Sequence, residues 1–152
     1  RRVLFRSMLN YLKEICKPTK GSKYSAGIDL YASQTVNVNV GHTAIIPLGI
    51  KINLAEIEND MTSEELESFK ERFYLELHPR SSLRAKGIVS GVGIIDIDYE
   101  DELKMIVHSL DYNTCIEEGM KVAQILLKEH STTMFDVTSD EKRLGGLGST
   151  GV

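Results

Sequence analysis

The chain has 152 residues, of which 41% are hydrophobic and 26% are charged, and its formal net charge at pH 7 is −4. This is the length of about one domain with the composition of an ordinary globular protein, and the lack of a basic stripe argues against a protein that coats nucleic acid. No apolar run approaches the ~20 residues that span a membrane, and the two cysteines are too few for a disulfide framework.

The N-terminal segment is set apart from the rest of the chain. Residues 1–7 are rich in arginine and precede Met8, a natural start position. We interpret residues 1–7 as an extension, with an arginine-rich targeting remnant as the alternative. We expect residues 8–141 to form a single β domain and residues 142–152 to form a glycine-rich tail.

Short alternating or β-branched runs follow, and they predict strands. Turn signals separate them, among them Gly41 and Gly119. Many short strands at this spacing are typical of a sandwich or jelly roll, so the fold class is all-β. The predicted strands are 35–40, 43–46, 49–53, 73–77, 103–107, 121–127 and 133–137.

One stretch, residues 55–72, departs from the β pattern. Residues 62–72 carry helix formers, with Leu66, Phe69 and Phe73 at helical spacing, and Thr62 with Glu65 reads as a capping box. The segment is also strongly acidic. Two interpretations stay open: a surface element that covers a sheet edge, or a site for a protein partner.

The segment from Gly91 to Tyr99 carries the first chemical signal. Its two glycines allow the backbone to approach a ligand closely, and Asp96 and Asp98 point to one face of a strand. Two carboxylates beside a tyrosine make a reasonable site for activating water. Aspartate at the end of a strand is also common in turns, which is the alternative.

Residues 143–151, the glycine-rich part of the C-terminal tail, carry the second signal. They contain four glycines and two hydroxyl residues, begin with Arg143 and directly follow Lys142. Backbone amides of glycine-rich segments can point at an anion, and hydroxyl and guanidinium groups add donors. Such a tail is suited to closing over a phosphate-bearing ligand, and a flexible polar end is the alternative.

Together with three further blocks, these segments resemble the trimeric dUTPase family. The five blocks occur in family order: Ala26–Ala32, Pro79–Ile88, Gly91–Tyr99, Gly119–Ile125 and the tail. The resemblance implies a jelly roll of the β-clip type with one helical insertion around 62–72, because family members usually have a short turn where residues 55–72 stand. It also implies a homotrimer with an exchanged C-terminal tail. The two free thiols fit a cytoplasmic protein, or a nuclear one if the source is eukaryotic or viral.

The implied activity is hydrolysis of dUTP to dUMP and pyrophosphate, which limits uracil in DNA and supplies dUMP for thymidylate synthesis. By resemblance, Asp96 activates the water, Mg²⁺ is held mainly by the phosphates, and Asp29 orders the metal's water shell without direct ligation. Arg80 and Gln124 are expected to contact phosphate. The expected substrate-binding residues are Ser81, Ser82, Gly91, Gly93, Ile94, Ile95, Tyr99, Arg143, Leu147, Gly148, Ser149 and Thr150.

Some residues depart from the family pattern. Leu147 stands where an aromatic usually stacks on the uracil. The tail arginine falls on Lys142 by the usual spacing or on Arg143 with a one-residue deletion, and we favour Arg143 because only a guanidinium forms a bidentate clamp.

Two rival functions fit parts of the pattern. Deamination of dCTP, which the same fold supports, needs a glutamate where Ile106 stands, so it is disfavoured. A dUTPase-like regulatory protein that binds its partner through residues 55–72 is the alternative function.

Overall fold

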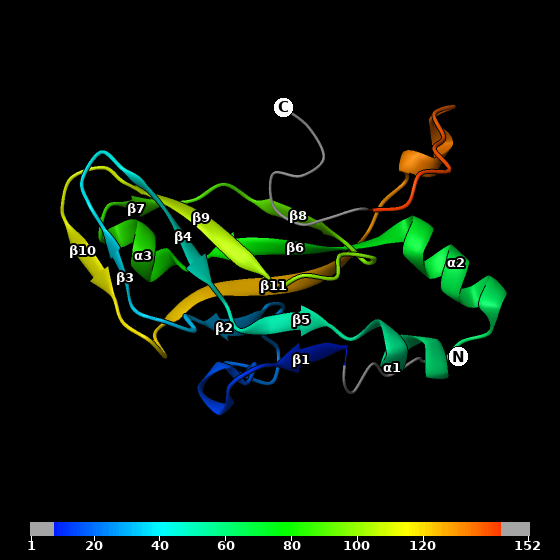
Figure 1. The fold of residues 1–152 in the computed structure, drawn as a ribbon, viewed down its shortest axis with the longest axis horizontal. Coiled ribbons are helices and arrows are strands. Elements are labelled where there is room, and N and C mark those ends of the chain that lie inside the picture. Colours follow the sequence, from blue (N-terminus) through cyan, green and yellow to red (C-terminus); the bar gives the residue numbers. More distant parts are fainter. Residues whose placement is uncertain (1–7, 144–152) are drawn as a thin grey trace.

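The computed structural model describes residues 8–143, and Figure 1 shows them as an elongated body of strands. Two antiparallel sheets form its layers. The larger sheet has the order β2-β11-β6-β8, from β2 (Ile28–Tyr31), β11 (Lys121–Glu129), β6 (Phe73–Pro79) and β8 (Gly93–Asp96). The smaller sheet has the order β4-β9-β7, from β4 (Thr43–Pro47), β9 (Lys104–Ser109) and β7 (Ile88–Val89).

Two further antiparallel pairs extend the layers. They are β1 (Leu9–Tyr11) with β5 (Ile50–Ile52), and β10 (Thr114–Ile116) with β3 (Val36–Val38). Short helical turns connect some of the strands: η1 (Glu14–Cys16) lies between β1 and β2, and α3 (Ser81–Ala85) lies between β6 and β7. A third, η2 (Thr132–Met134), follows β11.

A single apolar core lies between the layers. Alternate residues of β6 and β9 are buried, as the period of two in a strand requires. Each fully buried leucine or isoleucine contributes about 1.5–3 kcal/mol to folding. The largest buried side chains are Leu30, Ile46, Leu48, Ile50, Ile57, Leu83, Ile88, Ile97, Leu103 and Ile116.

The all-β prediction is confirmed, and six of the seven predicted strands form within a few residues of their expected bounds. The turn at Gly119 shows why glycine is needed there. Its φ is +84°, and a Cβ at this position would lie 2.4 Å from Cδ1 of Ile15. A side chain would therefore meet both backbone strain and a clash.

The prediction of a strand at 133–137 is wrong. Residues 132–134 form the turn η2, and Phe135 and Val137 continue without ladder hydrogen bonds. Their side chains, with that of Met134, are 68–86% exposed. A strand needs a neighbour for its backbone groups, and no described strand lies beside this segment.

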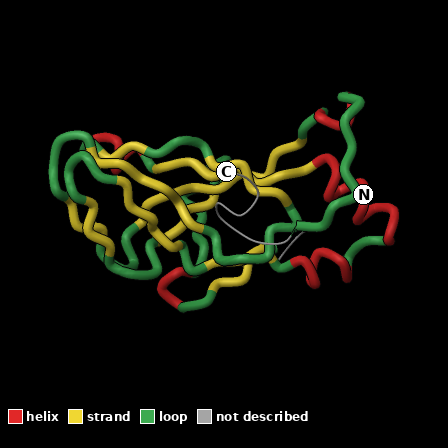
Figure 2. The backbone as a smooth tube through the Cα atoms, turned by 45° about the horizontal axis from the view of Figure 1, so that its top comes forward, coloured by secondary structure: helices red, strands yellow, loops and turns green. Residues whose placement is uncertain are grey.

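The helix predicted at 62–72 is present as α2 (Ser63–Arg72), with the capping box of Thr62 and Glu65 formed. Phe69 is 5% exposed and stacks on Phe73 with ring centroids 5.0 Å apart. A second helix, α1 (Leu54–Asn59), precedes it and was not expected from the sequence. Figure 2 shows both helices at one end of the strand body. Among residues 8–143, no helix has the length and apolarity to cross a membrane.

Candidate active site

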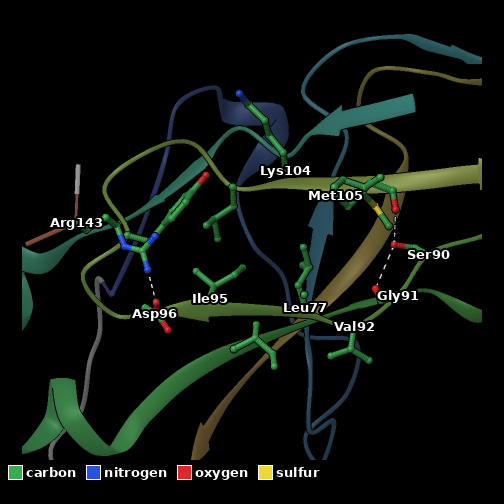
Figure 3. Close-up of a pocket in the computed structure, with 14 residues that line it drawn as sticks. Leu77, Ser90, Gly91, Val92, Ile95, Asp96, Lys104, Met105 and Arg143 are labelled. Atoms are coloured by element: carbon green, nitrogen blue, oxygen red, sulfur yellow. Dashed lines mark hydrogen bonds and ion pairs between the residues drawn. The ribbon is translucent and has the colours of Figure 1, made fainter. Parts of the chain in front are cut away.

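A cavity of about 420 Å³ opens between β8 and β9 (Figure 3). Its floor is apolar, with Leu77, Ile95, Leu103 and Met105, and polar groups stand on its rim. A pocket of this size with few polar groups suits one small organic ligand. The remaining lining residues are Ser90, Gly91, Val92, Gly93, Ile94, Asp96, Tyr99, Lys104, Ile106 and Arg143.

The loop between β7 and β8 connects the two sheets and forms one wall of the cavity, and a side-chain hydrogen bond holds it in place. Ser90 donates from Oγ to the carbonyl of Ile106 at 2.6 Å, which ties the loop to β9. A Cβ on Gly93 would lie 3.3 Å from Cβ of Leu77, so this glycine allows close packing on β6. A Cβ on Gly91 would meet nothing within 4 Å, which leaves its backbone open to a ligand.

Two carboxylates share one guanidinium at the end of the cavity. Asp96 ends β8, Ile97 turns into the core, and Asp98 returns to the surface. Arg143 donates from Nη2 to Asp96 and from Nε to Oδ1 of Asp98 at 3.2 Å. Its Cζ also lies 5.7 Å from the ring centroid of Tyr99. Figure 3 shows Arg143 directed at Asp96 over the cavity.

A second polar group surrounds Asp29 on β2, whose side chain is 13% exposed. Its Oδ1 lies 3.5 Å from Nη1 of Arg80, and its Oδ2 lies 3.6 Å from Nζ of Lys121. Gln124 stands opposite Asp29 in the ladder between β11 and β2. A Cβ on Gly27 would lie 2.6 Å from Oε1 of Gln124, so glycine makes room for this amide.

Ser81 and Ser82 lie beside this second group. They begin α3 directly after Arg80, and both are exposed. The backbone amide of Arg80 donates to the carbonyl of Val122 at 3.0 Å, which joins the start of α3 to β11. We call this set, with Asp29, Lys121 and Gln124, the Asp29 cluster.

The two groups lie at different places along β6. Asp96 of β8 lies opposite Tyr74 of β6. Arg80 follows Tyr74 by six residues in the chain. At ~3.3 Å per residue the two positions are roughly 20 Å apart. We call the cavity rim and the Asp29 cluster the half-sites, because the family resemblance implies that their residues act on one ligand, and the described part of one chain does not bring them together.

A row of polar side chains on β6 lies between the half-sites. Tyr74 donates from its hydroxyl to Oε2 of Glu76 at 2.6 Å, and Oε1 of Glu76 lies 2.6 Å from Nε2 of His78. The hydrogen bond from Tyr74, followed by that from His78, lowers the pKa of the Glu76 carboxyl. The same bond to Glu76 raises the pKa of the Tyr74 phenol.

Comparisons with known proteins agree on one family. The family model for dUTPase matches residues 69–151. The deoxyuridine 5'-triphosphate nucleotidohydrolase of Yarrowia lipolytica is 33% identical over 145 residues, covering 89% of this chain and 82% of the relative. The protein of the same name from Rickettsia prowazekii is 30% identical over 160 residues, covering 99% and 97%. The chain belongs to the dUTPase family.

Solved dUTPase structures share the fold. The dUTPase of Streptococcus mutans has a TM-score of 0.62 at 23% identity, covering 80% of this chain and 94% of that one. The native EIAV dUTPase also has a TM-score of 0.62 at 23% identity, covering 90% and 100%. The dUTPase of Staphylococcus aureus phage phi11 has a TM-score of 0.61 at 19% identity, covering 93% of this chain and 97% of that one. That structure is described as showing a species-specific insert.

The expected dUTPase motifs divide between the half-sites. The cavity takes Gly91, Gly93, Ile94, Ile95, Asp96, Tyr99 and Arg143. The Asp29 cluster takes Asp29, Arg80, Ser81, Ser82 and Gln124. Leu147, Gly148, Ser149 and Thr150 lie outside the described residues.

Sequence reasoning missed two charged residues of these groups, Lys104 and Lys121, as well as the apolar floor of the cavity apart from Ile95. Lys104 lines the cavity from β9, and no motif pointed to it. Lys121 begins β11 and contacts Asp29. The next two residues of the strand, Val122 and Ala123, are both fully buried. That pair of consecutive apolar residues was the available signal, because two buried neighbours in a strand indicate a bulge.

Proposed function

We propose that this chain hydrolyses dUTP to dUMP and pyrophosphate. The observation that carries the proposal is the cavity between β8 and β9, whose rim holds Asp96, Tyr99 and Arg143, in a chain of the dUTPase family. Its relatives in Yarrowia lipolytica and Rickettsia prowazekii are named for this reaction.

The uracil and the deoxyribose occupy the cavity. The exposed backbone of Gly91 offers amide and carbonyl groups to the edge of the base, and the apolar floor accepts its ring. Tyr99 packs under the sugar, where a 2'-hydroxyl would collide with its ring. Steric exclusion of this kind selects deoxynucleotides over ribonucleotides.

Asp96 orients a water molecule and accepts its proton. The water oxygen forms a bond to the α-phosphorus, the bond from that phosphorus to the bridging oxygen of the β-phosphate breaks, and pyrophosphate leaves with the electron pair. Arg143 binds Asp96 in this structure. The triphosphate competes for this guanidinium and draws it away, which frees the carboxylate to act as a base.

Mg²⁺ supplies charge neutralisation for the phosphates when it is bound. The residues fit a metal held mainly by substrate, because within residues 8–143 no three His, Cys, Asp or Glu side chains form a group that could hold a metal ion. Asp29 is already paired with Arg80 and Lys121, which suits contact through water and not direct ligation. One similar structure, an aspartate-to-asparagine mutant of the phage phi11 dUTPase, is described as revealing how a structural Mg(II) ion is coordinated.

Three copies of the chain assemble into a homotrimer. The roughly 20 Å between the half-sites supports this, because a complete site needs Asp96 of one copy and Arg80 of another. The exposed apolar residues Met134, Phe135 and Val137 support it as well. They precede the tail and would find a neighbouring strand on another copy.

The deciding experiment measures pyrophosphate release with Mg²⁺ from dUTP, dTTP, dCTP and UTP. We expect selective turnover of dUTP that Asp96→Asn abolishes while nucleotide binding persists. Retained turnover in Asp96→Asn would refute its role as the base. A folded, trimeric wild type that turns over none of the four would refute the proposed activity.

The alternative, regulation through residues 55–72, is favoured by the surface of α1 and α2. Ile57 and Phe69 are buried against the body, so the outward surface is acidic, with Glu56, Glu58, Asp60, Glu64 and Glu67 exposed. Such a surface suits a basic protein partner. Replacing residues 55–72 by a short turn separates the two functions: hydrolysis persists if the segment serves only partner binding.

A further inference from the structure

We infer that Lys121 is a positioning residue, aimed by a β-bulge at the carboxylate of Asp29. The inference deepens the proposed function and rests on it. It assigns to this chain a residue that holds Asp29 in place on the phosphate side of the site.

The bulge is visible in the pairing of β11 with β2. Gln124 pairs with Asp29 and Ala123 with Leu30, but the next pair is Lys121 with Tyr31, which leaves Val122 as an extra residue. Val122 and Ala123 are both fully buried. With regular alternation Lys121 would point into the core, as Ala123 does. The bulge instead places Lys121 on the face that carries Gln124 and Asp29.

The same bulge anchors the second cation. The carbonyl of Val122 accepts a hydrogen bond from the backbone amide of Arg80 at 3.0 Å. The strand position of Lys121 and the start of the Arg80 segment are therefore both set by Val122. A change in the bulge would move both positive charges relative to Asp29.

Each oxygen of Asp29 has its own cation, Arg80 at Oδ1 and Lys121 at Oδ2. Two cations on different oxygens restrict rotation of the carboxylate, whereas one would leave it free to turn about its last bond. The backbone is fixed too, because Asp29 exchanges hydrogen bonds with Thr19, donating at 2.7 Å and accepting at 3.2 Å. A carboxylate that is 13% exposed also needs charge compensation.

The cluster of Asp29, Arg80 and Lys121 carries more positive than negative charge. Asp29 is therefore held without cancelling the attraction for phosphate. Lys121 acts through Asp29, so its removal is expected to misplace the water shell that Asp29 orders and to slow the chemical step. The loss should appear in kcat more than in KM.

The test compares Lys121→Met, Lys121→Arg and the control Lys51→Met, an exposed lysine of β5. We expect Lys121→Met to lower kcat for dUTP about tenfold with little change in KM, and Lys121→Arg to restore most of it. Lys51→Met should match the wild type. In the Asp29→Asn background, Lys121→Met should lower kcat by less than about twofold, because the carboxylate that Lys121 positions is already lost.

Each contrary result has a distinct meaning. An equal loss from Lys121→Met in the wild-type and the Asp29→Asn backgrounds would overturn the inference and indicate that Lys121 contacts phosphate directly. An unchanged kcat in Lys121→Met would overturn it as well. An inactive wild type would refute the proposed function. In that case crystal structures of the wild type and Lys121→Met decide the inference. If the Asp29 carboxylate keeps its position in Lys121→Met, the inference is overturned.

Discussion

Arg80 follows directly after the end of β6, whereas Asp96 lies opposite Tyr74 near the start of that strand, so the two residues are roughly 20 Å apart along β6. Both are expected to act on one substrate. A triphosphate bound in the cavity of one chain cannot place its reacting phosphorus at both residues of that chain.

Two inactive variants should complement each other. Asp96→Asn and Arg80→Ala are each expected to be inactive as homotrimers. After mixing in denaturant and refolding, every mixed trimer contains one site with both wild-type residues. Random assembly should restore about a quarter of the wild-type rate. If Asp96 and Arg80 of one chain served the same site, mixing would restore nothing.

The tail cation should be Arg143 and not Lys142. Arg143 reaches both Asp96 and Asp98, whereas Lys142 has no ion pair among the described residues. We expect Arg143→Ala to lower kcat/KM for dUTP by about 100-fold or more. Arg143→Lys should recover little, because an ammonium lacks the planar fork. Lys142→Ala should stay within about threefold, and the opposite ranking would assign the clamp to Lys142.

Alanine at Gly91 and at Gly93 should separate binding from stability. At Gly91 the added Cβ meets nothing in the protein, so the free energy of unfolding should change by less than about 0.5 kcal/mol. The methyl group would still meet the base, and we expect KM for dUTP to rise about tenfold. At Gly93 the Cβ lies 3.3 Å from Leu77, so unfolding should become easier by about 1–3 kcal/mol. Urea unfolding and steady-state kinetics check both.

Stability at acid pH should depend on Glu76. Its pKa in the folded protein lies below the ordinary value, chiefly through the Tyr74 hydrogen bond. Ionised Glu76 therefore contributes stability that is fully present above the unfolded pKa of about 4.3 and is lost as pH falls through the lower folded pKa. The difference in unfolding free energy between wild type and Glu76→Gln should be larger at pH 7 than at pH 3.

Two further variants make this comparison specific. Tyr74→Phe removes the hydrogen bond that lowers the Glu76 pKa most. The unfolding free energy of this variant should therefore change less between pH 7 and pH 3 than that of the wild type. Glu71→Gln removes an exposed glutamate of α2 and serves as the control for loss of one negative charge. A Glu71→Gln curve that follows Glu76→Gln would refute a specific role for Glu76.

Local patterns predicted most of the secondary structure, for a physical reason. A strand that is buried on one face must alternate, so β3, β4, β6 and β9 could be read directly from the residues. The capping box of Thr62 and Glu65 marks the start of α2 for a similarly local reason, because both residues bond to the first helical turn. Helix α1 has only six residues and was not predicted.

Non-local contacts explain the failures. The segment 133–137 has the composition of a strand, but a strand also requires a neighbour, and within residues 8–143 none is present. Lys121 was missed because the bulge at Val122 reverses the alternation that a sequence pattern assumes. Lys104 reaches the cavity only because β9 and the segment of β8 line it from opposite sides.

The sequence alone determined the all-β class, the helix at residues 63–72 and the residue types of the five motifs, because alternation, capping and motif order are local properties of the chain. Only the tertiary structure decided that the motifs separate into two half-sites, since the distance between Arg80 and Asp96 follows from strand register in β6 and β8. It also decided that Lys121 faces Asp29, because one extra residue in β11 turns the side chain to the other face.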